Sequence, residues 1–378
     1  MTFDELVTAA ATEGASDIHL RAGHCPLVRV GGSLERWDSV AAVSAAELEA
    51  IAERLLPPAR QEMLREKLEV DVAWQAEGVG RCRASIFRQR GTVALSLRLI
   101  PANVPSLATL GLPASVVSLA DEQRGLVLVT GVTGSGKSTT LASVVALINR
   151  TRPVHILTIE DPIEFIHEDE LAVITQREIG FDTPSYASGL RAALRQDPDV
   201  ILIGEMRDPE TIETALTAAE TGHLVFSTLH TLDAPETINR IIGAFNPHQQ
   251  DQIRQQLARV LRAAISQRLL PRADGAGRAL AAEVLITTPY VRECIGDPDK
   301  TSLIADAIVA GGSQYGMQSF DQAILRLYQE GTVTLEEALR SVSNVEEFKM
   351  RLRGITPGST SGTIAGAVEP ARIQRFGS

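Results

Sequence analysis

The sequence is poor in cysteine and has no long apolar run. Its three cysteines, Cys25, Cys82 and Cys294, cannot build a disulfide framework in 378 residues, and no two stand close enough for a CxxC zinc pair. We therefore expect packed, reduced thiols and a cytoplasmic location. No apolar run reaches 18 residues, so we expect no direct insertion into a membrane. Residues 1–5 lack a basic stretch before an apolar one, so we expect no signal peptide.

Positive charge is also scarce. Lys and Arg total 36 against 47 Asp and Glu, a formal net charge of −11. Proteins that coat duplex DNA depend on dense Lys and Arg contacts to phosphate, so we expect no nucleic-acid partner. A local cationic groove is still compatible with this balance. With 44% hydrophobic and 22% charged residues, the composition is that of a globular protein, and the length predicts two or three domains.

Residues 1–100 have the pattern of an α+β domain. An opening helix is indicated by the spacing of Phe3, Leu6 and Val7, and a strand by residues 16–20. Two prolines divide residues 45–69 into two helices. Further strands are predicted at 70–74, 80–87 and 92–99. Two prolines between 101 and 105 indicate a linker, which we place at 101–113.

The pattern changes from residue 114 to one in which strands and helices alternate. Continuous apolar runs of the buried-strand kind occur at 125–130, 154–159, 200–203, 224–228 and 282–286. Helical stretches separate them at 138–150, 186–196, 209–221 and 248–267. This alternation predicts an α/β fold with a mostly parallel, doubly wound sheet over 114–353, ending in short helices at 318–353. Residues 354–378 are rich in Gly, Ser, Thr and Pro at their start, and we expect a disordered tail.

The strongest motif is Gly-Val-Thr-Gly-Ser-Gly-Lys-Ser at 131–138, a full match to G-x-x-x-x-G-K-[ST] between an expected buried strand and an expected helix. Glycines let the backbone N–H groups wrap around phosphates at the helix N-terminus. Lys137 would reach the β- and γ-phosphates and Ser138 would ligate Mg²⁺. The predicted ATP-binding residues of this loop are Gly131, Thr133, Gly134, Ser135, Gly136, Lys137, Ser138 and Thr139.

Acidic residues follow two other expected strands. Glu205 comes after the run at 200–203 and a small Gly204, and is placed to act at Mg²⁺. Glu160, Asp161 and Glu164 follow the run at 154–159. Because the chemistry of open α/β sheets lies at the carboxyl ends of strands, one of these acids would polarise the attacking water. Their positions alone do not decide between them.

Two histidines bracket the strand expected near 224–229. His230 stands at its carboxyl end, on the same edge as the phosphate-binding loop at 131–138, the P-loop. It would hydrogen-bond the γ-phosphate. His223 precedes the strand and follows Gly222, which has the character of a helix C-cap. Either histidine could equally be structural.

Further stretches accompany the P-loop in a fixed order. They are Leu-Thr-Ile-Glu-Asp-Pro-Ile-Glu-Phe at 157–165, Leu-Arg-Ala-Ala-Leu-Arg-Gln-Asp-Pro-Asp at 190–199, Gly-Glu-Met-Arg-Asp at 204–208, Thr-Gly-His at 221–223 and Thr-Leu-His-Thr at 228–231. Over about residues 1–350 the chain resembles the secretion/pilus ATPase superfamily. Within it, the chain is most similar to the type IV pilus retraction ATPases, the PilT family.

The resemblance implies a PAS-like N-terminal domain followed by a RecA-like ATPase domain. It implies a homo-hexameric ring that uses ATP and Mg²⁺, binds the platform protein of the pilus machine at the cytoplasmic face of the inner membrane, and removes pilins from the fibre. Carried over residue by residue, it makes Glu164 the catalytic acid and Glu205 the Walker B acid. Nucleotide contacts are also implied for five more residues. These are His223, His230, Arg81, Arg83 and Arg98.

Two segments depart from the family pattern. Retraction ATPases commonly carry Ala-Ile-Arg-Asn-Leu-Ile-Arg-Glu where this chain has residues 290–297, and here only Arg292 and Ile295 keep their places. Val132 replaces a usual proline in the P-loop, and we expect little effect. The first departure leaves open whether the ATPase removes pilins from the fibre or adds them. Pilus extension or type II secretion is therefore an alternative. That alternative is disfavoured, because such ATPases carry an extra N-terminal domain and a tetracysteine zinc insertion that this chain lacks.

A nucleotide-binding ring partner without strong hydrolysis is a second alternative. The intact Lys137, Glu164 and Glu205 argue against it. A RecA-like DNA translocase is disfavoured by the acidic balance of the chain.

Overall fold

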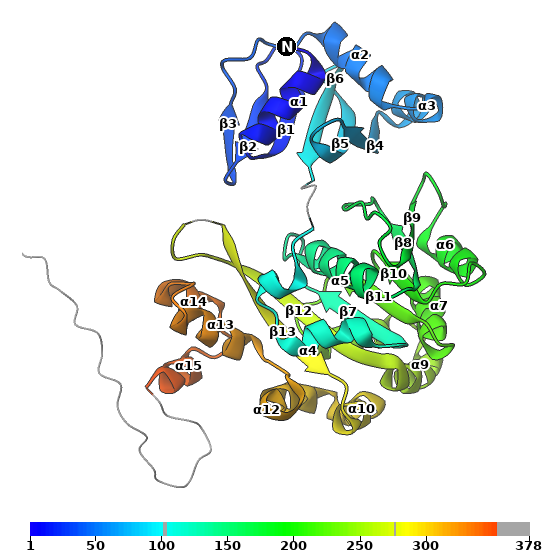
Figure 1. Cartoon of the computed structure of the whole chain (residues 1–378), viewed down its shortest axis with the longest axis vertical. Coiled ribbons are helices and arrows are strands. Elements are labelled where there is room, and N and C mark those ends of the chain that lie inside the picture. The colour runs from blue at the N-terminus through cyan, green and yellow to red at the C-terminus, as the bar shows by residue number, and fades with distance from the viewer. Residues whose placement is uncertain (101–103, 276, 354–378) are drawn as a thin grey trace, which may run out of the picture.

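The computed structural model describes residues 1–100, 104–275 and 277–353. The tail expected at 354–378 and the first three residues of the expected linker lie outside the described residues. Two β-sheets organise the rest, one on each side of that linker (Figure 1).

The N-terminal sheet is antiparallel and has the strand order β3-β2-β1-β6-β5-β4. Its elements run in this order: α1 (Phe3–Thr12), β1 (Ala15–Arg21), β2 (Leu27–Val30), β3 (Ser33–Arg36), α2 (Ala45–Leu55), α3 (Pro58–Lys67), β4 (Glu69–Ala76), β5 (Gly80–Gln89) and β6 (Thr92–Leu99). Both expected helices in 45–69 are present, and Pro58 begins the second one. The short strands β2 and β3 were not predicted.

One face of this sheet packs against the three helices. Alternate residues of β5, such as Cys82, Ala84 and Ile86, are fully buried in that core. The intervening positions, among them Arg81 and Arg83, therefore point to the other face.

The second sheet carries the expected alternation of strands and helices. Its elements begin with η1 (Leu107–Leu110), α4 (Ala114–Ser118), η2 (Leu119–Asp121), β7 (Gly125–Thr130), α5 (Lys137–Thr151), β8 (His155–Glu160), β9 (Val173–Glu178), α6 (Tyr186–Ala193) and β10 (Val200–Ile203). They continue with α7 (Pro209–Glu220), β11 (Leu224–Leu229), α8 (Ala234–Gly243), α9 (Pro247–Val260), β12 (Leu261–Pro271) and β13 (Arg278–Ile286).

The strand order is β13-β12-β7-β11-β10-β8-β9. All neighbouring pairs are parallel except β12 and β13, so the expected mostly parallel α/β sheet is confirmed. Successive residues of β7 face opposite layers. Leu126 and Leu128 join a core with α6 to α11, and Val127 and Val129 join one with α4 and α5.

One expected element is wrong. The helix predicted over 248–267 ends at Val260, and Leu261–Pro271 is strand β12, which pairs with β7 and β13. Hydrogen bonding to two neighbouring strands outweighs the local helical pattern. The edge strand β9 was also missed, because its half-exposed residues lack an apolar run.

The described part of the chain ends in a helical region. Its elements are α10 (Pro289–Gly296), η3 (Pro298–Leu303), α11 (Ile304–Ala310), α12 (Gly312–Tyr315), α13 (Phe320–Gln329), α14 (Leu335–Ser341) and α15 (Val345–Leu352). Phe320, Ile324 and Phe348 form a small core with β12 and β13. No helix in the described ranges is both long and apolar enough to cross a bilayer.

The segment expected as linker up to residue 113 is partly built into the second core. Leu107, in η1, is 2% exposed and packs with Val116, Leu141 and Val145. Leu107 therefore acts as a core residue.

Leu107→Ala tests this assignment. We expect the free energy of unfolding of the second domain to fall by about 2–4 kcal/mol, since a buried leucine leaves a cavity. Urea unfolding of the full chain measures this change. An unchanged unfolding midpoint would show that residue 107 still belongs to a free linker.

Candidate functional site

Parallel strands bring the sequence motifs to one edge of the sheet. In register, Thr130 of β7 pairs with Leu229 of β11, and Ile203 of β10 pairs with Ile159 of β8. The residues that follow these strands therefore lie at the same edge. They are the P-loop, His230, Glu205 and the segment 160–164.

The P-loop joins β7 to α5 and has the backbone that phosphate binding requires. Gly131 has φ +135° and Gly136 has φ +93°, a region that favours glycine. A Cβ at Gly131 would lie 2.5 Å from the carbonyl oxygen of Gln267. The Oγ atom of Ser135 is buried and has no hydrogen-bond partner among the described residues. This glycine-lined loop at the start of a helix fits a bound polyphosphate.

Lys137 is the cation of this loop. Its Nζ atom donates to the carbonyl oxygens of Gly131 at 2.7 Å and Val132 at 3.1 Å. Burial lowers the pKa of Lys137, while the nearby carboxylates of Glu205 and Glu164 act to raise it. The two predicted acids are therefore close enough to act on the P-loop lysine.

Glu205 is held between an arginine and a histidine. Its carboxylate pairs with Nη2 of Arg207 at 2.8 Å and with Nε2 of His230 at 3.2 Å. Burial alone would raise the pKa of Glu205, but Arg207 and His230 hold it below its ordinary value. Gly204 packs tightly here, because a Cβ would lie 2.9 Å from the hydroxyl of Tyr186. Glu205 is thus an ionised group facing the P-loop.

Glu160 and Glu164 occupy different environments. Oε1 of Glu160 accepts hydrogen bonds from Thr158 at 2.6 Å and Gln176 at 3.2 Å. Burial raises the pKa of Glu160 to about 7. Glu164 is partly exposed and acts on Lys137. This contrast favours Glu164 as the acid that meets water and Glu160 as a structural support.

His223 lies away from this edge. It precedes β11, and Leu224 pairs with Gly125 at the start of β7. At roughly 3.3 Å per residue, the strand separates His223 from His230 by about 20 Å. Its Nδ1 atom lies 2.9 Å from the carbonyl oxygen of Ala218, where it caps the end of α7. The predicted nucleotide contact of His223 therefore does not fit the site within one subunit.

The three predicted arginines share the outer face of the N-terminal sheet. Arg83 on β5 stands directly opposite Arg98 on β6 in the strand register. Arg83 lies 3.4 Å from Asp71, and Nε of Arg98 donates to Asp17 at 3.0 Å. Arg81 is partly buried and pairs with Glu178, at the end of β9 in the second domain. Within the described ranges, none of these contacts is with the P-loop.

Sequence reasoning missed residues that support the site. Tyr186 is one, because its hydroxyl adjoins Gly204 and burial raises its pKa beside Asp161 and Glu205. Gln267 is another: it donates to Thr140 at 2.7 Å behind the P-loop. Neither was predicted as a site residue, because neither belongs to the P-loop or to the acidic segments that follow the strands.

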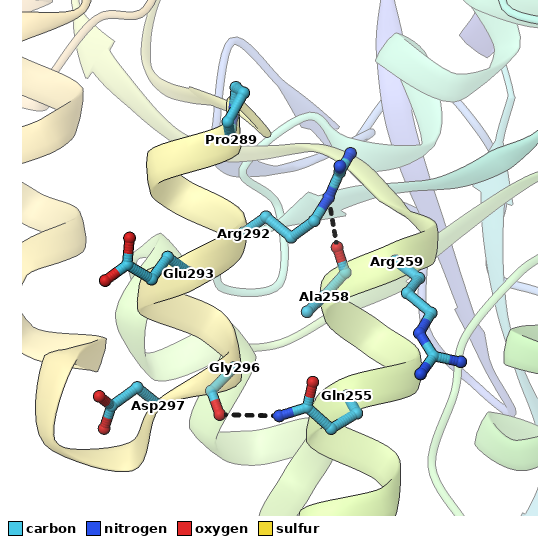
Figure 2. Close-up of a pocket in the computed structure, with 8 residues that line it drawn as sticks. All are labelled: Gln255, Ala258, Arg259, Pro289, Arg292, Glu293, Gly296 and Asp297. Carbon is cyan, nitrogen blue, oxygen red and sulfur yellow. Dashed lines mark hydrogen bonds between the residues drawn. The ribbon is translucent and has the colours of Figure 1, made fainter.

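The divergent segment 290–297 forms most of α10, and a groove of about 520 Å³ lies between α10 and α9 (Figure 2). Nε of Arg292 donates to Ala258 at 3.1 Å, and Gln255 donates to Gly296 at 3.1 Å. Strand β13 runs antiparallel to β12 and ends at Ile286, so α10 follows the sheet edge opposite the P-loop. The groove is therefore separate from the nucleotide site.

Comparisons with known proteins agree with this geometry. The model of the family described as type II/IV secretion system protein matches residues 2–291. The type IV pilus retraction ATPase PilT of Pseudomonas aeruginosa is 42% identical over 348 residues, which cover 92% of this chain and 100% of that protein. A twitching motility protein of Neisseria gonorrhoeae is 44% identical over 323 residues, 85% of this chain and 86% of its own length.

The fold is also similar to a solved structure. The crystal structure of the pilus retraction motor PilT with bound ADP superposes with a TM-score of 0.84 at 44% identity. The match covers 92% of this chain and 98% of that one. The expected α/β class and two-domain ATPase arrangement are thereby confirmed.

The raised pKa of Glu160 predicts a pH dependence of stability. Between the ordinary pKa of 4.5 and about 7, the folded protein keeps a proton that the unfolded chain loses, so stability falls as pH rises. We expect Glu160→Gln to gain stability over wild type by up to about 3 kcal/mol across this window. Urea unfolding at pH 5 and pH 8 measures the difference. If the free energies of unfolding of variant and wild type differed by the same amount at both pH values, the raised pKa of Glu160 would be contradicted.

Proposed function

This chain belongs to the family of type II/IV secretion system proteins, and we propose that it is the ATP-hydrolysing motor of type IV pilus retraction. The chain is an ATPase of this family, with the nucleotide site at the carboxyl edge of the second sheet. The observation that carries the proposal is the convergence of Lys137, Glu205 and Glu164, since Lys137 lies within electrostatic reach of both acids.

The proposed chemistry assigns one task to each group. The P-loop amides and Lys137 hold the phosphates and neutralise charge that develops in phosphoryl transfer. Glu164 orients the attacking water and accepts its proton. His230, paired with Glu205, adjoins the position expected for the γ-phosphate. Ser138 and Glu205 would hold Mg²⁺, which supplies additional charge neutralisation when bound.

The arginines of the N-terminal sheet complete the proposal. Arg83 and Arg98 have exposed side chains on one sheet face and are suited to bidentate phosphate contact. We assign them, with Arg81, to the nucleotide when the two domains close over it. Hydrolysis would then release the domains, which is how the site would convert chemistry into movement.

The working assembly that we propose is a homo-hexameric ring. It would act at the cytoplasmic face of the inner membrane on the platform protein of the pilus machine. The divergent helix α10 is suited to partner contact, because its groove with α9 opens at the sheet edge remote from the P-loop. Its departure from the family pattern keeps pilus extension or secretion as the alternative function.

Glu164→Gln separates nucleotide binding from hydrolysis. We expect ATP to bind with near wild-type affinity while kcat falls about 100-fold or more, because the amide cannot accept the proton of water. Steady-state ATPase assays and fluorescent-nucleotide titration give the two quantities. Glu160→Gln is the matched control, expected to lose much less activity. A larger loss in the control would move the catalytic role to Glu160.

Deletion of the gene in the source organism tests the direction of work. A retraction motor predicts more surface pili and loss of twitching, since fibres are built but not withdrawn. A plasmid copy should restore twitching, and a Lys137→Ala copy should not, because the P-loop lysine is lost. Electron microscopy and motility plates measure both. A strain without pili would support the extension alternative instead.

A further inference from the structure

Strand β9 supports the loop that carries Glu164. Gln176 and Glu178 are two positions apart, so their side chains share one face of the strand. Gln176 donates to the carbonyl oxygen of Phe165 at 2.8 Å and accepts from the amide of His167 at 2.9 Å. Oε2 of Glu178 accepts from the buried amide of Ile163 at 3.1 Å. The two side chains therefore hold the loop on both sides of Glu164.

Glu178 also receives a contact from the other domain. The same Oε2 atom that accepts from Ile163 accepts from Nη2 of Arg81, on β5 of the N-terminal sheet. The side chain of Glu178 is 6% exposed and that of Arg81 is 19% exposed. A carboxylate so deeply buried is costly to leave without its cation. One oxygen atom thus joins the N-terminal domain to the loop of Glu164.

A second residue of the N-terminal domain contacts the turn that follows Glu178. Nη2 of Arg60, on α3, donates to the carbonyl oxygen of Gly180 at 3.0 Å. The Arg60 guanidinium lies over the ring of Phe181, 4.4 Å from its centroid. The turn is itself rigid, because the carbonyl oxygen of Glu178 accepts from the amides of three residues. These are Phe181, Asp182 and Thr183.

We propose that Glu178 is a positioning residue through which the N-terminal domain controls the placement of Glu164. When the domain is docked as in this structure, Arg81 and Arg60 hold Glu178 and its turn. Glu178 then holds the amide of Ile163, next to Glu164 in the chain. When the domain moves, the buried carboxylate loses its cation, and the loop of Glu164 is released.

This coupling adds a consequence to the function proposed above, on which it rests. Nε of Arg81 is buried and has no hydrogen-bond partner among the described residues. This atom is therefore available to a phosphate while Nη2 stays on Glu178. A nucleotide contact there would link domain closure to the hold on the loop of the catalytic acid.

Arg60→Ala in the full chain tests the coupling, since Arg60 lies outside the proposed catalytic machinery. We expect faster hydrogen exchange in the peptide covering 161–167, in the other domain. We also expect kcat to fall about three- to tenfold, with the KM for ATP within about twofold of wild type. Arg65→Ala is the matched control on the same helix, where Arg65 makes an exposed pair with Glu62. The control should leave both measurements unchanged.

Glu178→Gln provides a second variant of nearly the same shape. Its amide oxygen still accepts from Ile163, but its neutral side chain no longer pairs with Arg81 as an ion. We expect the same kcat loss at unchanged KM, and no further loss when it is combined with Arg60→Ala. Wild-type kcat in Glu178→Gln, or exchange in Arg60→Ala equal to that in Arg65→Ala, would overturn the coupling.

The two proposals fail in different ways. Hydrogen exchange is measured without nucleotide, so it reports on the coupling even in a chain that does not hydrolyse ATP. Wild-type hydrolysis together with unchanged exchange in Arg60→Ala refutes the coupling alone. Absence of hydrolysis in the wild-type chain refutes the proposed function.

Discussion

The parallel hydrogen-bonded register of β7, β11, β10 and β8 is the constraint on which the rest of the structure depends. It brings the P-loop, His230, Glu205 and the 160–164 segment to one edge, although they span 100 residues of chain. Because side chains alternate along a strand, a slip of one residue would exchange the two apolar layers that cover the sheet. Core packing and placement of the chemical groups are therefore specified by the same register.

Charge at this edge is arranged in opposed pairs. Lys137 faces Glu205 and Glu164, and Glu205 is also held by Arg207 and His230. Glu160 is the last residue of β8, just before the loop of Glu164. Its carboxylate accepts hydrogen bonds from the uncharged Thr158 and Gln176, and burial raises its pKa. Two carboxylates four residues apart thus have different surroundings, because one is buried among uncharged donors and the other is partly exposed near Lys137.

Much of this could be predicted from the sequence, because the decisive signals are local. The P-loop lies between a buried strand and a helix, and Glu205 directly follows another buried strand, so both sites follow from short motifs. The region 261–267 was misread because its Ala-rich pattern continues that of α9, and only pairing with β7 and β13 makes it a strand. The pairing of Arg81 with Glu178 joins residues 97 apart and has no local signal at all. The same holds for Gln176, whose role depends on which loop the edge strand meets in space.

The most direct test of the account is a structure of the full chain with a non-hydrolysable ATP analogue and Mg²⁺. We expect the polyphosphate on the amides of 131–138, with the γ-phosphate beside Lys137, Glu205 and His230 and a water within reach of Glu164. We also expect Arg81 to stay paired with Glu178. Nucleotide bound elsewhere, or a γ-phosphate with Glu164 turned away from it, would contradict the central claim that this sheet edge is the hydrolytic site.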